Sequence, residues 1–259
     1  AATLPGIAVI HTAFNLLCVA ILMPMAPLLE KLALRVIHDA PAPEHKTELD
    51  ERLLASPALA LGQCREVTMK MADCAVQALR GSLLSVTDYT PALAEQVRAD
   101  EEVTDHYEDI LGTYLVKLSS QTLTAADSEN ATELLKAIGD FERIADHAVN
   151  IVESAEELQS KGLTLSEAAQ ADLKVLEAAV EEILDRSADA FRRGDAQAAA
   201  AVEPLEQVVD LLKEQLRTRH ILRMREGKCS IEAGFVWADL LTDLERTSDH
   251  CSNIACLLY

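Results

Sequence analysis

The stretch Phe141-Glu-Arg-Ile-Ala-Asp-His-Ala-Val-Asn-Ile151 decides the fold, because the chain contains it twice. The second copy is Leu244-Glu-Arg-Thr-Ser-Asp-His-Cys-Ser-Asn-Ile254, in which Glu, Arg, Asp, His, Asn and Ile recur position by position. Around the first copy, apolar residues recur in steps of four and three, which is the period of one helix face. A repeat period of about a hundred residues is too long for a solenoid and predicts a duplicated three-helix bundle.

Helix signals continue on both sides of this stretch. Gly162 and Gly194 predict helix ends. Thr164 with Glu167 predicts a capping box for the helix that follows, and Asp195 predicts the N-cap of the next helix. The composition agrees, because 49% of the residues are hydrophobic but only 3% are aromatic, which suits helix-on-helix packing.

The N-terminal residues have a different character. No charged residue precedes Glu30, and the apolar run from Ile7 to Leu29 has the length of a bilayer-spanning helix. Basic residues follow the run at once, which predicts that the chain leaves the membrane on the cytoplasmic side. His11 and Asn15 lie four apart and therefore share one helix face, where they are candidates for an interhelical hydrogen bond or for a transport path.

The predicted organisation has four parts. Residues 1–36 hold one hydrophobic transmembrane helix, the last of a transport domain whose upstream part is missing, since the chain lacks an initiator Met. Residues 37–56 form a linker. Residues 57–161 and 162–259 form the two repeated three-helix bundles of an all-α fold with six long helices. We expect the protein in the inner (plasma) membrane, with residues 37–259 cytoplasmic.

Pairs of acidic residues at a spacing of four predict metal binding. That spacing puts both carboxylates on one helix face, off the apolar seam and close enough to share a cation. Oxygen ligands suit Mg²⁺, Mn²⁺ or iron. The alternative is a plain solvated acidic face, because 43 acidic residues produce such pairs by chance. The four pairs are Glu101/Asp105, Glu142/Asp146, Glu206/Asp210 and Glu245/Asp249, and the supporting residues are Asn150, Asn253, His147 and His250.

Charge and motif content exclude other classes of function. A net charge of −20 argues against nucleic acid, which requires a basic face. The chain shows no Ser/His/Asp or Cys/His constellation and no glycine-rich phosphate loop. A bundle di-iron enzyme uses a Glu-x-x-His motif that faces inward, whereas the spacing here is four. The two histidines are better suited to interhelical hydrogen bonds than to the same cation, because adjacent helix positions point about 100° apart. We therefore do not expect an enzyme.

The two-half plan with Glu142-Arg-Ile-Ala-Asp-His-Ala-Val-Asn-Ile151 resembles the PhoU family over about residues 57–259. This resemblance implies regulation of phosphate uptake and metal binding by the carboxylates. The segments Ala8-Val-Ile-His-Thr-Ala-Phe-Asn15 and Leu49-Asp-Glu-Arg-Leu-Leu-Ala-Ser-Pro57 are similar to bacterial sodium/phosphate cotransporters, which carry a PhoU-like domain on their cytoplasmic C-terminal side.

These resemblances together imply the C-terminal portion of a sodium-dependent phosphate cotransporter. Its expected partners are the missing upstream transport domain, the inner membrane, phosphate-signalling proteins and a second copy of the chain. The alternative function is a membrane-tethered helical adaptor that binds a protein partner without metal.

Overall fold

The computed structural model describes residues 11–20, 23 and 49–259, in two units, 1–47 and 48–259. In the first unit residues 11–20 are helical, and Asn15 Nδ2 lies 3.0 Å from His11 Nε2, which confirms that the two side chains share a helix face. Most of the predicted membrane helix lies outside the described residues. Within the described part of the chain, no helix combines the length and the apolar composition needed to cross a bilayer.

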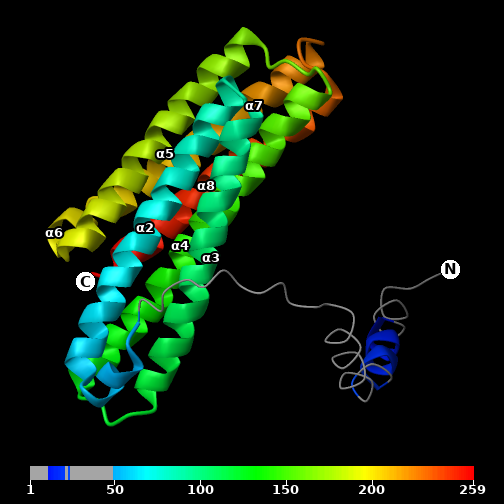
Figure 1. Cartoon of the computed structure of the whole chain (residues 1–259). Helices are drawn as coiled ribbons and strands as arrows, with labels where there is room; N and C mark the ends of the chain where they lie inside the picture. The colour runs from blue at the N-terminus through cyan, green and yellow to red at the C-terminus, as the bar shows by residue number, and fades with distance from the viewer. Residues whose placement is uncertain (1–10, 21–22, 24–48) are drawn as a thin grey trace. The chain divides into compact units, whose positions relative to one another are not determined.

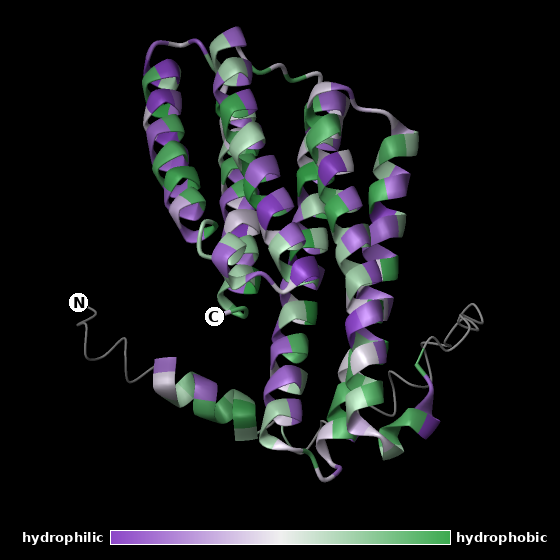
Figure 2. Cartoon of the chain, turned by 90° about the vertical axis from the view of Figure 1, so that its left-hand side faces the viewer, coloured by the Kyte–Doolittle hydropathy of each residue, from purple (hydrophilic) through white to green (hydrophobic). Residues whose placement is uncertain are grey.

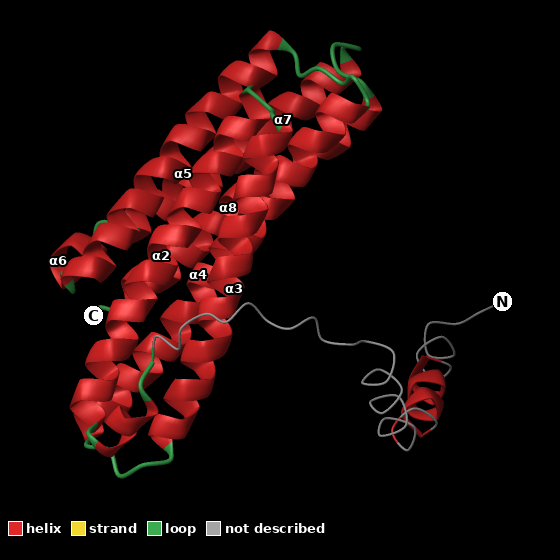
Figure 3. Ribbon diagram, viewed as in Figure 1, coloured by secondary structure: helices red, strands yellow, loops and turns green. Residues whose placement is uncertain are grey.

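The second unit is built from helices alone, as far as the structure describes it, and this confirms the all-α prediction (Figure 3). One 3-10 turn precedes the first long helix, within the segment predicted as a linker. The elements are η1 (Glu51–Ala55), α2 (Pro57–Thr87), α3 (Pro91–Ser119), α4 (Ala125–Ser160), α5 (Glu167–Arg193), α6 (Ala196–Ala199), α7 (Glu203–Arg225) and α8 (Ile231–Cys256).

Two helical bundles lie side by side in this unit (Figure 1). Helices α2, α3 and α4 form the first bundle, and α5, α7 and α8 form the second. They meet where α4 packs on α8 and where α2 packs on α5. Polar and apolar residues alternate around each helix, as Figure 2 shows, so every helix buries one face. Aromatic packing also crosses this boundary, because Phe141 of α4 meets Phe191 of α5 edge to face at 5.3 Å.

Two predicted helix starts are wrong in detail. The N-cap of α5 is Ser166, whose hydroxyl accepts a hydrogen bond from the Ala169 N–H at 3.2 Å, so Thr164 and Glu167 do not form the predicted capping box. Asp195 does cap a helix, but that helix is the short α6. The long helix α7 begins afresh beside Pro204, because proline is tolerated in the first turn of a helix and not in its interior.

Candidate functional site

The two copies of the repeated motif meet where α4 packs on α8, and each supplies a histidine to the other. His147 Nδ1 lies 2.9 Å from Asp243 Oδ1, and His250 Nδ1 lies 2.9 Å from Asp140 Oδ1. The two imidazole rings also face each other, with their centroids 5.7 Å apart. Both histidines therefore make interhelical hydrogen bonds, the role that their position in the sequence favoured.

The motif asparagines join the same contact. Asn150 Nδ2 donates to Asp243 Oδ1 at 3.3 Å, and Asn253 Nδ2 donates to Asp140 Oδ1 at 3.2 Å. These amides are therefore bonded across the bundle boundary through their nitrogens. Asp140 and Asp243 accept these hydrogen bonds and were not among the residues predicted from the sequence. Their signal was present, because an aspartate stands directly before each copy of the motif.

The structure brings the four carboxylate pairs together two by two. The pairs of α3 and α4, Glu101/Asp105 and Glu142/Asp146, form a first ladder, and those of α7 and α8, Glu206/Asp210 and Glu245/Asp249, form a second. Burial, followed by the neighbouring charge of Asp146, raises the pKa of Glu101. Burial, again followed by Asp146, raises the pKa of Glu142 to about 7. The guanidinium of Arg143 partly offsets these negative charges, because it lies 3.3 Å from Glu142 and 2.9 Å from Asp146. The first ladder is therefore a half-buried patch of crowded negative charge.

Glu108 adds a further carboxylate to this patch, and the sequence analysis did not include it. Burial, followed by the charge of Asp105, raises the pKa of Glu108. Glu108 in turn contributes to the raised pKa of Glu142. It lies three residues after Asp105 and so continues the same helix face, which is the signal that could have identified it.

The second ladder brings three of its carboxylates together. Glu206 and Asp210 of α7 and Asp249 of α8 each offer an oxygen within 4.8 Å of the others, and no other such group of three occurs among the described residues. Burial raises the pKa of Glu206, with Asp210 and then Asp249 as the next causes. Three convergent oxygens from two helices are a donor set that suits a hard cation.

Lys213 distinguishes the second ladder from the first. Its Nζ lies 2.8 Å from Glu245 Oε1, and the two side chains are only 22% and 15% exposed. Lys213 follows Asp210 of α7 by three residues, and Glu108 follows Asp105 of α3 by three residues. The two residues therefore occupy equivalent positions in the two halves. The other oxygen of Glu245, Oε2, is buried without a hydrogen-bond partner among the described residues. One ladder thus gains an extra carboxylate at the position where the other gains an ammonium group.

Comparisons with known proteins agree with this two-bundle geometry. The phosphate-specific transport system accessory protein PhoU homolog of Pseudomonas aeruginosa is 25% identical over 201 residues, which are 76% of this chain and 81% of that protein. The crystal structure of PhoU from Pseudomonas aeruginosa matches with a TM-score of 0.72 at 25% identity, covering 76% of this chain and 94% of that chain.

A third relative aligns with nearly the whole chain. The putative inorganic phosphate export protein YjbB of Salmonella typhimurium is 23% identical over 257 residues, which are 95% of this chain but only 46% of that protein. The chain therefore spans about half the length of this relative.

The model of the PhoU domain family matches the chain twice, at residues 68–155 and at residues 173–258. The two matches coincide with the two bundles, and each includes one copy of the repeated motif and the carboxylates beside it. The chain therefore belongs to the PhoU domain family.

Proposed function

We propose that this chain is the C-terminal portion of a sodium-dependent phosphate transporter, and that its PhoU domain regulates phosphate movement in response to bound cations. The alignment with the Salmonella phosphate export protein carries this proposal, because it covers 95% of the chain and 46% of that protein. That alignment therefore includes residues that precede the PhoU domain match, which begins at residue 68.

In this proposal residues 1–36 supply the last transmembrane helix of the transport part, with His11 and Asn15 beside the path of the solute. Residues 37–259 then lie on the cytoplasmic side of the inner membrane. The cotransporter resemblance implies uptake, whereas the name of the Salmonella relative specifies export. Phosphate flux must therefore be measured in both directions.

The two ladders would act as the cation-responsive elements. In the second bundle Glu206, Asp210 and Asp249 would hold the ion, and in the first bundle the ion would lie between the carboxylates of α3 and those of α4. Mg²⁺, Mn²⁺ or an iron ion fits these oxygen donors. Burial, followed by the neighbouring carboxylates, raises the pKa of Glu206 and Asp249. A bound cation would relieve the repulsion between these carboxylates and would hold α7 against α8. The transport domain or a phosphate-signalling protein would then bind differently to the ladder with and without the cation.

This role requires binding and no catalysis. The histidines of the site are held in hydrogen bonds to Asp243 and Asp140. These contacts favour a structural role for His147 and His250 over proton transfer. We therefore infer a regulatory domain that changes its partner's activity through a change in its own surface.

The first test is the metal content and metal-dependent melting of the 259-residue chain, purified with chelator and then titrated with Mg²⁺, Mn²⁺ or Fe²⁺. A cation that binds only the folded state stabilises it by about 2.7 kcal/mol at a hundredfold excess over Kd. The test variant replaces Glu142, Asp146, Glu245 and Asp249 by Ala. A matched control removes four exposed acids outside the ladders, namely Glu66, Glu129, Glu153 and Glu182.

The test variant should lose both bound metal and regulation of phosphate flux in the full-length protein that contains this chain, and the control should keep both. Unchanged metal content and unchanged flux in the test variant would refute the proposal. Absence of metal from the unsubstituted chain, with no melting shift on titration, would favour the membrane-tethered adaptor that binds a protein partner.

A further inference from the structure

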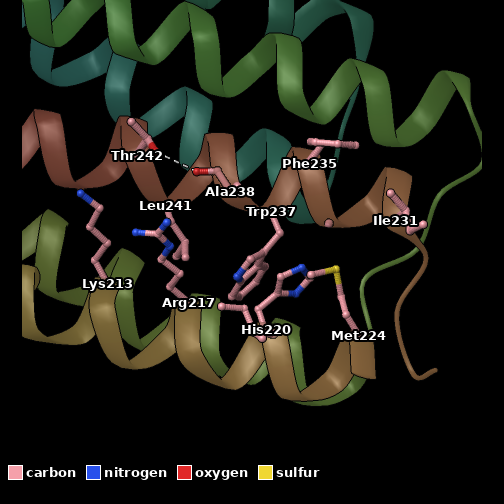
Figure 4. A pocket seen from close by; sticks show the side chains of 12 residues that line it. Lys213, Arg217, His220, Met224, Ile231, Phe235, Trp237, Ala238, Leu241 and Thr242 are labelled. Carbon is pink, nitrogen blue, oxygen red and sulfur yellow. Dashed lines mark hydrogen bonds between the residues drawn. The ribbon is translucent and has the colours of Figure 1, made fainter. Parts of the chain in front are cut away.

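A groove of about 480 Å³ lies between α7 and α8, beyond the second ladder (Figure 4). Its walls are largely apolar and include Ile221 and Met224 of α7 and Ile231 and Leu241 of α8. The side chain of Ile231 is also well exposed to solvent, at 73%. Exposed apolar surface that lines a concave site typically marks a binding surface, and this volume lies within the range of sites that bind small molecules.

Two aromatic side chains in the groove carry polar atoms without partners. His220 is only 5% exposed, yet neither of its ring nitrogens has a hydrogen-bond partner among the described residues. Trp237 Nε1 also has no hydrogen-bond partner among the described residues. The two rings stack with centroids 5.8 Å apart and planes 26° apart, and Figure 4 shows Trp237 pointing from α8 toward His220. Buried polar atoms are normally satisfied, so these three buried nitrogens in the wall of the groove lack the partner that a ligand's polar atom would supply if the wall opened slightly.

The equivalent positions of the first bundle hold side chains that only pack. By the sequence repeat, His220 corresponds to Leu115 and Trp237 corresponds to Leu134. Both leucines are buried, at 0% and 4% exposure. A plain apolar contact is therefore sufficient to join the two helices at this level, whereas the second bundle has aromatic side chains with polar ring nitrogens at these positions.

A glycine keeps the groove open beside these rings. A Cβ atom at Gly234 would lie 3.0 Å from His220 Nε2 and 3.0 Å from Met224 Sδ. Both contacts are closer than ordinary van der Waals separation, so any side chain at this position would intrude on the space in front of the imidazole. Gly234 therefore offers a way to narrow the groove by substitution.

The rim of the groove is basic, although the chain as a whole has a net charge of −20. Lys213 and Arg217 line one end, and Figure 4 shows both rising from α7 toward α8. The Arg217 side chain is 67% exposed, and its acidic neighbour Glu214 is 3.9 Å away. Burial, followed by the charge of Arg223, lowers the pKa of His220, so a neutral imidazole that can donate and accept faces the groove. Of the basic side chains here, Lys213 is paired with Glu245 and Arg217 is the more exposed one, whereas Arg219 and Arg223 pair with Asp172 and do not line the groove.

We propose that this groove binds a small amphiphilic anion, with an aromatic or acyl body against the apolar walls and a carboxylate, sulfonate or phosphate head on Arg217. The occupant is one free molecule of moderate size, because the volume, the buried hydrogen-bonding nitrogens and the short basic rim all match a compact ligand. This site adjoins the second ladder, because Lys213 lines the groove and also pairs with Glu245, but it does not depend on the cation-binding role proposed for the ladders.

Trp237 is the only tryptophan in the chain, so its fluorescence reports on this groove. The experiment titrates the 259-residue chain with anilinonaphthalene sulfonate and, separately, with N-phenylnaphthylamine, the same ring system without the charge. We expect saturable quenching of Trp237 by the sulfonate and about fivefold weaker binding of the uncharged probe, since an exposed ion pair contributes up to about 1 kcal/mol. Arg217→Glu should remove this preference. Arg225→Glu changes the same charge at an exposed position that does not line the groove, and should leave it intact.

Gly234→Ala should weaken both probes, because its methyl group narrows the groove without removing any charge. Far-UV circular dichroism would show that this variant and Arg217→Glu remain folded. The proposal is overturned if Trp237 responds to neither probe, or if Arg217→Glu and Gly234→Ala bind as the unsubstituted chain does. A response to phosphatidylglycerol vesicles but to neither free probe would also overturn it and would assign the groove to a membrane surface.

Discussion

His147 of α4 and Asp243 of α8 are joined by a hydrogen bond of 2.9 Å. The equivalent residues of the other motif copy, His250 of α8 and Asp140 of α4, form a second hydrogen bond of the same length. The contact is reciprocal, because the histidine of each motif copy bonds the aspartate that precedes the other copy. It lies on the boundary between the two bundles, where the half-buried side chains are partly shielded from water.

A double-mutant cycle tests this contact directly. We expect His147→Ala and Asp243→Ala each to lower the free energy of unfolding by about 1 to 2 kcal/mol, with a coupling energy of about 1 kcal/mol between them. The measurement is urea unfolding followed by circular dichroism. The matched cycle pairs His147 with Asp140, which lies on the same helix and bonds the other histidine. Equal coupling energies in both cycles would show that the hydrogen bond between His147 and Asp243 makes no specific contribution to the free energy of unfolding.

The ladder asymmetry predicts opposite effects for two charge reversals. Lys213→Glu removes the ammonium group that lies 2.8 Å from Glu245, so metal-free stability should fall by about 2 kcal/mol, and added Mn²⁺ should recover more stability than in the unsubstituted chain. Glu108→Lys places a positive charge in the first ladder, so metal-free stability should rise and the Mn²⁺ effect there should shrink. Thermal melting with chelator and then with Mn²⁺ checks both variants. The exposed Lys136→Glu is the control, and an identical response in all three variants would contradict the asymmetry.

Glu177 should make stability fall as pH rises. Burial, and then the charge of Glu181, raises its pKa from the ordinary 4.5 to about 7, and one of its oxygens is buried without a hydrogen-bond partner among the described residues. The folded state therefore binds this proton more tightly than the unfolded state does. Its contribution is complete below pH 4.5 and is lost as pH rises through about 7.

The substitution Glu177→Gln should abolish this dependence. We expect the variant to match the unsubstituted chain at about pH 4 and to exceed its free energy of unfolding at about pH 8 by about 1 to 2 kcal/mol, after allowance for partial exposure. Unfolding in chelator across this pH range gives the comparison. The exposed Glu129→Gln should show no such difference. A gain that is the same at both pH values would assign the effect to something other than the proton.

Two helix glycines should respond in opposite directions to alanine. A Cβ at Gly81 would lie 2.8 Å from Val97 Cγ2, whereas a Cβ at Gly139 would have nothing within 4 Å. Gly81→Ala should therefore lower stability by about 1 to 2 kcal/mol through overpacking, and Val97→Ala in the same chain should restore part of it. Gly139→Ala should raise stability by about 0.5 to 1 kcal/mol through helix propensity. Thermal melting of the three variants measures these effects. Stabilisation by Gly81→Ala would contradict the prediction and would show that α3 can shift away from α2 to make room for the methyl group.

The all-helical fold could be predicted from the sequence because its signals are local. The apolar period and glycines such as Gly162 lie within one helix or at its end, and the duplicated motif needs no knowledge of the third dimension. The capping box at Thr164 failed because Ser166, two residues later, offers an equally good hydroxyl. The continuous helix expected after Asp195 is wrong because Pro204 lies in the first turn of a new helix, where proline is tolerated.

The candidate site was predictable only in part, since its chemistry depends on which helices meet. Spacing identified Glu206 and Asp210 as partners on one helix, but it could not show that Asp249 joins them while Glu245 turns to Lys213. That division depends on side chains brought together from α7 and α8. His220 carried no sequence signal for the groove, because a single histidine in an apolar period resembles an ordinary core position.

The exchange of histidine and aspartate between the two motif copies limits how the duplicated halves can diverge during evolution. A change at Asp140 in the first copy affects His250 in the second, so neither copy can drift alone where the two touch. Positions that face away from the contact are free of this restraint, and there the halves have taken different residues, such as Glu108 and Lys213. The contact between the two motif copies is thus held in common, while positions outside it differ between the halves.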